Sequence, residues 1–196
     1  MENNREVISR VIQESIGVQA QVLEECIPII ARMADMLVRA LQAGYKVVLF
    51  GNGGSAADAQ HVAAELVNRF LMERDALPAI ALTTNTSILT SVSNDDAFDQ
   101  VFARQVQALV QEGDVVVGIS TSGNAPSVLQ GILAAREKGV VTVGFTGRSG
   151  GKLKGLVDLC FCVPSDSTPR IQEAHITVWH AICEVVEQEL FGGKAA

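Results

Sequence analysis

The stretch from residue 46 to residue 70 constrains what this chain can fold into more than any other part of its sequence. Residues 46–50 (KVVLF) are a short, β-branched, apolar run of the length expected for a buried strand. The turn GNGGS follows at residues 51–55, and residues 56–70 contain no Gly or Pro, which predicts a helix. A strand, a tight turn and a helix in this order predict one unit of a parallel α/β sheet.

The same alternation continues along the chain. Further apolar runs predict strands at residues 78–82, 115–119, 140–145 and 159–163. Helical patterns occupy residues 88–92, 98–111, 126–138 and 169–190. The predicted fold class is therefore α/β, a five-stranded parallel sheet with helices on both faces.

Two polar loops leave this predicted sheet at the carboxyl ends of strands. One is residues 51–55, which ends in Ser55, and the other is residues 120–124 (STSGN); each opens a helix. Free backbone N–H groups and the positive end of a helix dipole favour an anion there, and open α/β sheets bind ligands at this edge. The glycines match neither the dinucleotide nor the Walker pattern. The loops favour phosphate binding, with simple turns and helix caps as the alternative.

His61 and Glu65 lie four residues apart in the first predicted helix after the strand, so they share one helix face. An imidazole and a carboxylate at this spacing can share a divalent metal or divide acid and base work. The alternative is a surface pair worth about a few tenths of a kcal/mol.

The last predicted helix carries Gln172, His175 and His180 among apolar residues. At about 100° per residue, His175 and His180 lie about 140° apart and cannot both serve one site. Gln172 and His180 lie about 80° apart and roughly 12 Å along the axis. Those two converge only if both side chains lean toward a common point, or if two subunits supply them.

The composition limits the partners and the compartment. A chain of 196 residues with 48% apolar and 19% charged residues is one well-buried domain. A formal charge of −7 argues against a nucleic-acid binder that neutralises phosphates, so local N–H and hydroxyl groups must hold any anionic substrate. The polar N-terminus and the lack of long apolar runs predict no signal peptide, no membrane partner and a cytoplasmic location.

The four cysteines show no metal-binding spacing. Cys160 and Cys162 alternate on a predicted strand and are expected to point to one face as small core residues.

Residues 5–43 read as helix, with Gly17 and Pro28 expected to bend or break it. This is more helix than a small sheet needs to cover one face. We interpret residues 1–43 as a helical oligomerisation segment that precedes an α/β sandwich at residues 44–196; a simple two-helix lid is the alternative.

Several motifs in order resemble those of the sedoheptulose 7-phosphate isomerases, also called phosphoheptose isomerases, a family of sugar-isomerase (SIS) domain enzymes. The motifs are GNGGS at residues 51–55, His61-x-x-x-Glu65, Asn94-Asp95, STSGN at residues 120–124, and RIQEAH with His180 in the last helix. The similarity runs nearly end to end and includes the N-terminal helical part. The resemblance implies a single SIS domain over residues 1–196, with its sheet in flavodoxin-like order.

The resemblance also implies a homotetramer with active sites between subunits. It implies one zinc ion per subunit, held by His61, Glu65, Gln172 and His180. It places the phosphate at Ser55, Ser120, Thr121 and Ser122, and places Asn52, Gly53, Gly54, Asn94 and Asp95, with Glu65 and Gln172, around the sugar. One departure is Ala125, where family members usually carry a phosphate-binding Ser. We expect weaker phosphate binding rather than lost activity, and whether Ser127 substitutes is left open.

The reaction that the resemblance implies turns a 2-ketose phosphate into an aldose phosphate through an enediol, the first step of ADP-heptose synthesis for lipopolysaccharide or capsule. Glu65 suits the proton transfer at carbon, and His180 suits the proton transfer at the oxygens near neutral pH. One alternative is a regulator similar to the initiator-associating protein, which binds the replication initiator DnaA and lacks this carboxylate and imidazole. Another is a sugar-phosphate sensor without turnover.

Overall fold

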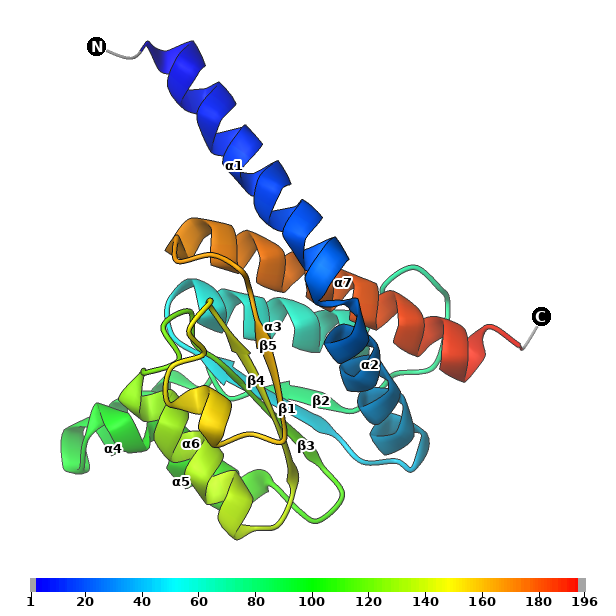
Figure 1. The fold of residues 1–196 in the computed structure, drawn as a ribbon. Helices are drawn as coiled ribbons and strands as arrows, with labels where there is room; N and C mark the ends of the chain where they lie inside the picture. Colours follow the sequence, from blue (N-terminus) through cyan, green and yellow to red (C-terminus); the bar gives the residue numbers. More distant parts are fainter. Residues whose placement is uncertain (1–2, 194–196) are drawn as a thin grey trace.

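The computed structural model describes residues 3–193, so the outermost residues of the predicted 1–196 domain lie outside the described part. Its centre is a parallel sheet of five strands in the order β2-β1-β3-β4-β5 (Figure 1). The strands are β1 (Val47–Gly51), β2 (Ala79–Ala81), β3 (Val115–Ile119), β4 (Val141–Thr146) and β5 (Leu159–Cys162). The predicted five-stranded α/β fold and its strand order are confirmed.

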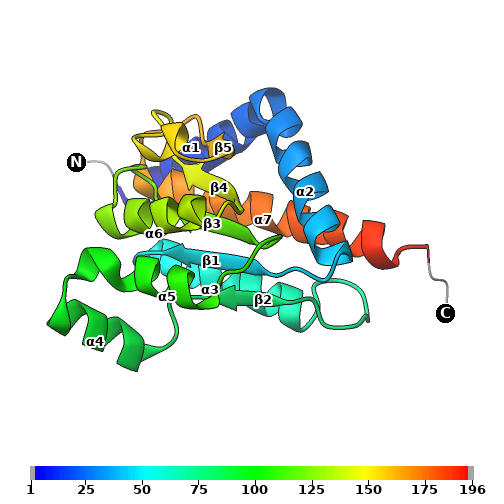
Figure 2. The same cartoon turned by 90° about the horizontal axis from the view of Figure 1, so that it is seen from below.

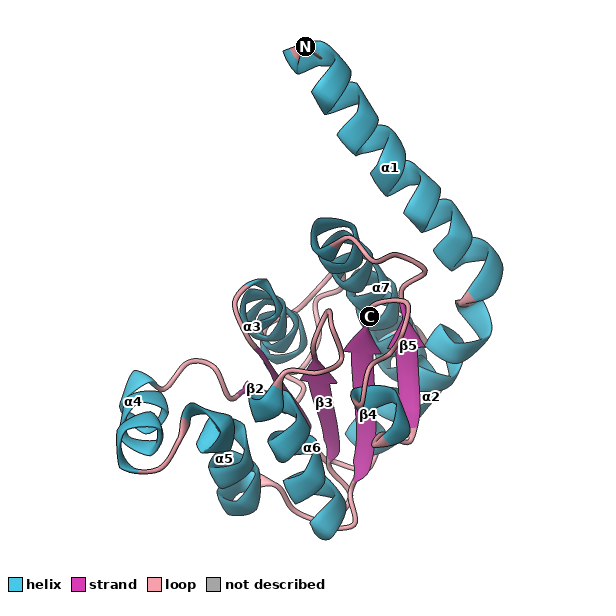
Figure 3. Ribbon diagram, turned by 60° about the vertical axis from the view of Figure 1, so that its left-hand side comes forward, coloured by secondary structure: helices cyan, strands magenta, loops and turns pink. Residues whose placement is uncertain are grey.

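Helices cover both faces of the sheet. One face is covered by α2 (Ile27–Gln42), α3 (Gly54–Val67) and α7 (Thr168–Phe191), and the other by α5 (Val101–Leu109) and α6 (Pro126–Glu137) (Figure 3). Crossovers between parallel strands are right-handed. From β1 the chain crosses to β2 on one side of the sheet, and from β3 it crosses to β4 on the other side. Helices α3 and α6 therefore lie on opposite faces, and the loops that lead into them separate.

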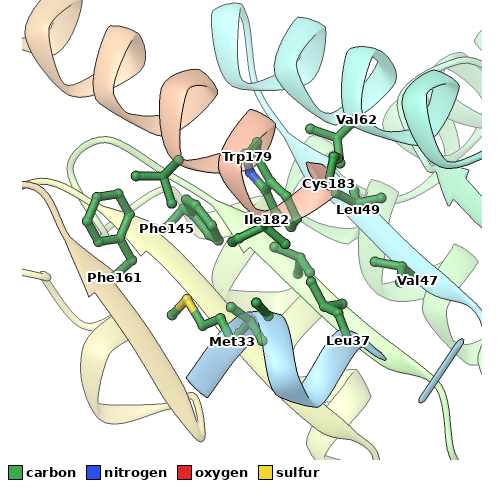
Figure 4. Packing of buried hydrophobic residues seen from close by; sticks show 14 of the residues in the cluster. Met33, Leu37, Val47, Leu49, Val62, Phe145, Phe161, Trp179, Ile182 and Cys183 are labelled. Carbon is green, nitrogen blue, oxygen red and sulfur yellow. The ribbon is translucent and has the colours of Figure 1, made fainter. Parts of the chain in front are cut away.

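Strand alternation divides the core into two clusters, because successive side chains of a strand point to opposite faces. Val47 and Leu49 of β1 join the cluster beneath α2, α3 and α7, whereas Val48 and Phe50 join the cluster beneath α5 and α6. Figure 4 shows the first cluster, in which Trp179 of α7 lies against Phe145 of β4 with ring centroids 4.6 Å apart. This packing fixes α7 on the sheet.

The N-terminal segment forms two helices, α1 (Asn4–Glu25) and α2, separated at Cys26. Pro28 lies in the first turn of α2, where its missing N–H costs little, so the predicted break is confirmed near Pro28. The predicted break at Gly17 is wrong: Gly17 lies inside α1, because a single glycine weakens a helix by about 1 kcal/mol without ending it. The first half of α1 projects away from the sheet (Figure 1).

Other predicted boundaries shift by a few residues. Helix α3 begins at Gly54, inside the predicted turn, and ends at Val67 instead of residue 70. Helix α4 (Thr86–Asp95) is longer than predicted and is capped by the side chain of Asn85, so it includes Asn94 and Asp95. Short 3-10 helices, η1 (Phe98–Gln100) and η2 (Leu153–Gly155), precede α5 and β5 respectively. Figure 2 shows α4 and α2 at opposite ends of the molecule.

Cys160 and Cys162 point to the same side of β5, as predicted, with their Sγ atoms 3.7 Å apart, but both are half-buried rather than core residues. Within residues 3–193, no helix is long and apolar enough to cross a membrane.

His175 is the buried histidine of the fold, and it makes stability depend on pH. Its Nε2 donates to the carbonyl of Thr146 at 3.1 Å. Burial lowers the pKa of His175 to about 4, and the hydrogen bond to Thr146 opposes this only partly. The unfolded chain therefore binds a proton more readily than the native protein between about pH 6.5 and pH 4, so stability falls as the pH falls through that window.

We expect the His175→Gln variant to be less stable than wild type at pH 7 but to lose less of its stability on acidification. The contribution of His175 to the pH dependence is on the order of 3 kcal/mol between pH 6.5 and pH 4. Urea denaturation at several pH values measures it. Equal losses in the two proteins over this range would contradict the assignment.

Candidate functional site

The candidate site lies where the strand order reverses, between the carboxyl ends of β1 and β3. Residues 51–55 leave β1 there, and residues 120–124 leave the neighbouring β3. Gly51 is needed for this close approach, because a Cβ built on it would lie 2.7 Å from Cβ of Ser55 and 2.8 Å from the carbonyl oxygen of Ile119. The predicted meeting of the two polar loops at one edge is confirmed.

The loop at residues 120–124 is held by hydrogen bonds to the loop that follows β4. The N–H of Gly147 donates to the carbonyl of Thr121, and the N–H of Leu153 donates to the carbonyl of Gly123. Within the loop, the N–H of Asn124 donates to Oγ of Ser122 at 3.1 Å. Ser120 is buried, whereas the side chain of Ser122 is exposed. The loop is therefore a fixed arrangement of N–H and hydroxyl groups.

A cavity of about 310 Å³ opens beside this loop. It is polar and includes one arginine; its lining residues are Thr121, Ser122, Asn124, Gly147, Arg148, Ser149, Ser165, Asp166, Thr168 and Ile171. Its hydroxyls suit an anion, while the guanidinium of Arg148 pairs with Asp166, which lines the same cavity, at 3.2 Å. Asn94 and Asp95 do not line it. Asp95 lines a different cavity, together with Ser91 and Arg104 between α4 and α5.

The side chain of Asn52 turns toward α6. Its amide donates to Oγ of Ser127 at 2.9 Å, and Ser127 is buried at 1% exposure. The hydroxyl of Ser127 thus orients Asn52, and Ala125 supplies no hydroxyl of its own.

His61, Glu65 and His180 form a cluster on the exposed side of α3 and α7. The Nε2 atom of His61 lies 3.1 Å from Oε1 of Glu65 and 3.1 Å from Nε2 of His180. One ligand atom from each residue can be chosen so that all lie within 4.8 Å of one another. His61 is 48% exposed and Glu65 is 22% exposed. Two imidazoles and a carboxylate that converge in this way suit zinc.

Gln172 lies at the other end of the contact between α3 and α7. Its side-chain amide occupies the space above Gly54, where any Cβ would collide with it. Gly54 and His61 are separated by roughly 10 Å along α3. Within one chain, Gln172 therefore faces the glycine turn with Gly53 and Ser55, not the histidine cluster, and its predicted ligand role stays a prediction.

Phe70 was not predicted as a site residue; its ring stacks on that of His180 with centroids 5.3 Å apart. Arg74 and Glu187 were not predicted either; they form a buried ion pair with Nε and Oε1 2.8 Å apart. Burial by itself would raise the pKa of Glu187, but three backbone N–H groups and Arg74 lower it below its ordinary value. Glu187 lies seven residues beyond His180, so helical spacing was the signal for placing it on the same face.

Asp58 is a further carboxylate on the face of α3 that carries His61. It lies three residues before His61, a spacing that places both side chains on one face. Its Oδ2 is buried and makes no hydrogen bond within the described residues. Burial raises the pKa of Asp58 to about 6, and the nearby His61 opposes the shift.

Comparison with known proteins gives consistent matches over most of the chain. The SIS domain family model matches residues 12–147. A phosphoheptose isomerase from Roseiflexus sp. (strain RS-1) is 58% identical over 180 residues, which are 92% of this chain and 91% of the relative. The solved structure of phosphoheptose isomerase GmhA from Neisseria gonorrhoeae superposes with a TM-score of 0.90 at 40% identity, covering 95% of this chain and 100% of that one. A phosphoheptose isomerase from Francisella tularensis gives 0.92 at 36% identity, covering 95% and 99%.

The loop at residues 120–124 yields a test of its docking. Gly123 has φ +64°, and a Cβ there would collide with the backbone of Gly150 and Gly151. Gly139 has a similar φ of +69° but open space around it. We expect Gly139→Ala to lower the free energy of unfolding by about 1 kcal/mol. Gly123→Ala should lower it by a further ~1–3 kcal/mol, because the loop must move.

Urea denaturation of both variants separates backbone strain, which they share, from the collision, which only Gly123→Ala suffers. Equal losses of stability in the two variants would show that the loop at residues 120–124 is not packed against Gly150 and Gly151 of the loop after β4.

Proposed function

The chain belongs to the phosphoheptose isomerase family of SIS-domain enzymes, and from this membership we propose that it converts sedoheptulose 7-phosphate to D-glycero-D-manno-heptose 7-phosphate. The family identifies it as an isomerase, as predicted from the motifs. The observation that supports the substrate and mechanism is the cluster of Glu65, His61 and His180 on α3 and α7, on the helices whose sheet also presents two phosphate-type loops at the carboxyl ends of β1 and β3. The product would enter ADP-heptose synthesis for lipopolysaccharide or capsule.

The isomerisation moves a proton from C1 to C2 and a second proton between the two oxygens. Glu65 is the base that removes the C1 proton and returns one to C2, since a carboxylate suits proton transfer at carbon. His180 moves the proton at the oxygens, and the ring of Phe70 on one of its faces limits its orientation. His61, within hydrogen-bond distance of both, orders their side chains.

The donor set fits zinc, which the family resemblance implies. His61, Glu65 and His180 would hold it, with Gln172 as the fourth ligand. When bound, the ion supplies a Lewis acid that stabilises negative charge on substrate oxygens. Because Gln172 of the same chain faces Gly54, we propose that the site is completed between subunits.

The proposed assembly is a homotetramer built on the N-terminal helices. The isoleucines Ile8, Ile12 and Ile16 of α1 recur every four residues and are 55–63% exposed in the single chain. An exposed apolar stripe on a projecting helix suits contact with another copy of the chain. Asn94 and Asp95 do not line the cavity beside residues 120–124, so we assign their contact with the sugar to a site shared with a neighbouring subunit.

The phosphate group is assigned to Ser55, Ser120, Thr121 and Ser122 and to the N–H groups of their loops, with Asn52, Gly53 and Gly54 beside the sugar. With a formal charge of −7, the chain attracts an anion through these local groups rather than through its overall field. A cytoplasmic location suits a sugar-phosphate substrate. A non-catalytic regulator is not favoured, because the relatives are isomerases and the carboxylate and imidazole are both present.

Replacing Glu65 by Gln or His180 by Gln should abolish conversion of sedoheptulose 7-phosphate. Loss of a positioned acid or base costs ~10²–10⁴-fold in rate, so kcat should fall at least that far. A coupled assay with the purified enzyme measures it. Glu112→Gln, on an exposed turn at the opposite edge of the sheet, is the matched control and should retain full activity. Undiminished turnover in either active-site variant would refute the mechanism.

Removing the metal should also abolish activity. We expect the purified protein to contain zinc, to lose activity with a chelator and to recover it with added zinc, because three converging side chains would hold the ion. His61→Ala should lower the zinc content measured by elemental analysis. Full activity in metal-free protein would contradict the zinc assignment while leaving the isomerase assignment in place.

A further inference from the structure

Glu187 is a buried carboxylate near the end of α7 that binds the chain segment following α3. Its two oxygens accept hydrogen bonds from the N–H groups of Phe70, Leu71 and Met72 at 2.8, 2.8 and 2.9 Å. Its side chain is 2% exposed and pairs with Arg74, whose side chain is 1% exposed. The carboxylate therefore fixes three consecutive residues that lie just beyond the last turn of α3.

Arg74 extends this connection to α3 itself. Its Nη2 donates to the carbonyl of Glu65 at 2.7 Å, and its Nη1 donates to the carbonyl of Leu66 at 2.9 Å. The last carbonyls of a helix lack partners within the helix, and the guanidinium supplies them here. The backbone of Glu65, the residue assigned as the base, is thus hydrogen-bonded to the arginine of the pair.

Glu187 is also connected to His180, through Phe70. Phe70 donates its N–H to Glu187, and its ring stacks on the imidazole of His180 at an interplanar angle of 20°. His180 is also contacted by His61 at 3.1 Å. One buried ion pair therefore holds the backbone of Glu65 on one side and the ring that packs on His180 on the other.

We propose that Glu187, acting with Arg74, is a positioning residue for the isomerase reaction: it sets the placement of Glu65 relative to His180. The proposal rests on the proposed function. Neither side chain touches the reacting atoms. Glu187 acts through the backbone of residues 70–72 and through Phe70, and Arg74 acts through the carbonyl of Glu65.

The alternative is that the pair only anchors the connection between α3 and β2. A buried ion pair is weak evidence for stability, because the cost of removing two charges from water offsets much of their attraction. Directional hydrogen bonds to backbone groups on both sides of a site suit positioning better than apolar packing would. An anchor alone would change stability, whereas a positioning residue changes kcat and the surroundings of His180.

The chain offers a matched control for this distinction. Asp114 is a fully buried carboxylate that accepts from the N–H groups of Lys46 and Gln111 and pairs with the ammonium group of Lys46. It lies just before β3, at the opposite edge of the sheet from the candidate site. Asp114→Asn removes a similar buried charge that binds similar groups, without a contact to the histidine cluster.

The first experiment compares Glu187→Gln with Asp114→Asn in the zinc-loaded enzyme. Glutamine keeps the volume, but its NH₂ group cannot accept from a backbone N–H, so residues 70–72 must shift. Misplacement of a catalytic group by about 1 Å can cost ~10²-fold, so we expect kcat to fall by about 10- to 100-fold with KM unchanged. KM should not change, because the phosphate-type loops lie at the other end of α3. Asp114→Asn should lose stability but keep kcat.

The second measurement does not depend on turnover. The chain has three histidines, so the ring signals in its NMR spectrum can be assigned individually. In Glu187→Gln the His180 ring signals should shift as the ring of Phe70 moves away, while those of buried His175 stay in place. Phe70→Leu, which keeps Glu187 and its backbone partners, should produce the same shift and a loss of kcat even if Glu187→Gln fails to fold.

Two results would overturn the proposal. One is a kcat in Glu187→Gln no lower than in Asp114→Asn. The other is an unchanged His180 signal in Phe70→Leu. If the wild-type enzyme does not turn over sedoheptulose 7-phosphate, the proposed function fails, and the NMR comparison still decides whether Glu187 positions His180.

Discussion

The packing of α3 beside α7 is the constraint on which the rest of the site depends. His61 meets His180 across 119 residues of sequence, and Gly54 meets Gln172 across 118. The difference in residue number between contacting residues is thus nearly constant. The two helices therefore run in the same direction and in register, since both rise by about 1.5 Å per residue. Figure 1 shows them side by side. The contact between His61 and His180 follows from this alignment.

The apolar core beneath the two helices enforces the alignment. Trp179 directly precedes His180 and stacks on Phe145 of β4, while Val62 directly follows His61 and is fully buried. Each helix thus turns an apolar residue toward the sheet (Figure 4), whereas the adjacent histidine is less buried. Because buried side chains in a close-packed core have little freedom, the polar residues beside them inherit a fixed position.

The sequence predicted what local patterns encode. The alternation of strands and helices predicted the sheet, and the four-residue spacing predicted that His61 and Glu65 share a face. It did not predict that α3 ends at Val67, because Glu187, more than a hundred residues away, takes the N–H groups of the following residues. Arg74 and Phe70 were missed for the same reason. Their roles depend on tertiary contacts, and an arginine or a phenylalanine in a connecting segment carries no periodic signal.

The geometry of one chain is also the reason for proposing that a partner subunit completes the site. Proton transfer from carbon is favoured in a site that excludes water, yet His61 is half-exposed in the single chain. Gln172 faces the glycine turn, and Asp95 borders a separate cavity. The exposed isoleucines of α1 provide a surface for another copy of the chain. A neighbouring subunit that covers the cluster would supply the missing polar groups and remove the water together, so assembly and catalysis would depend on the same contact.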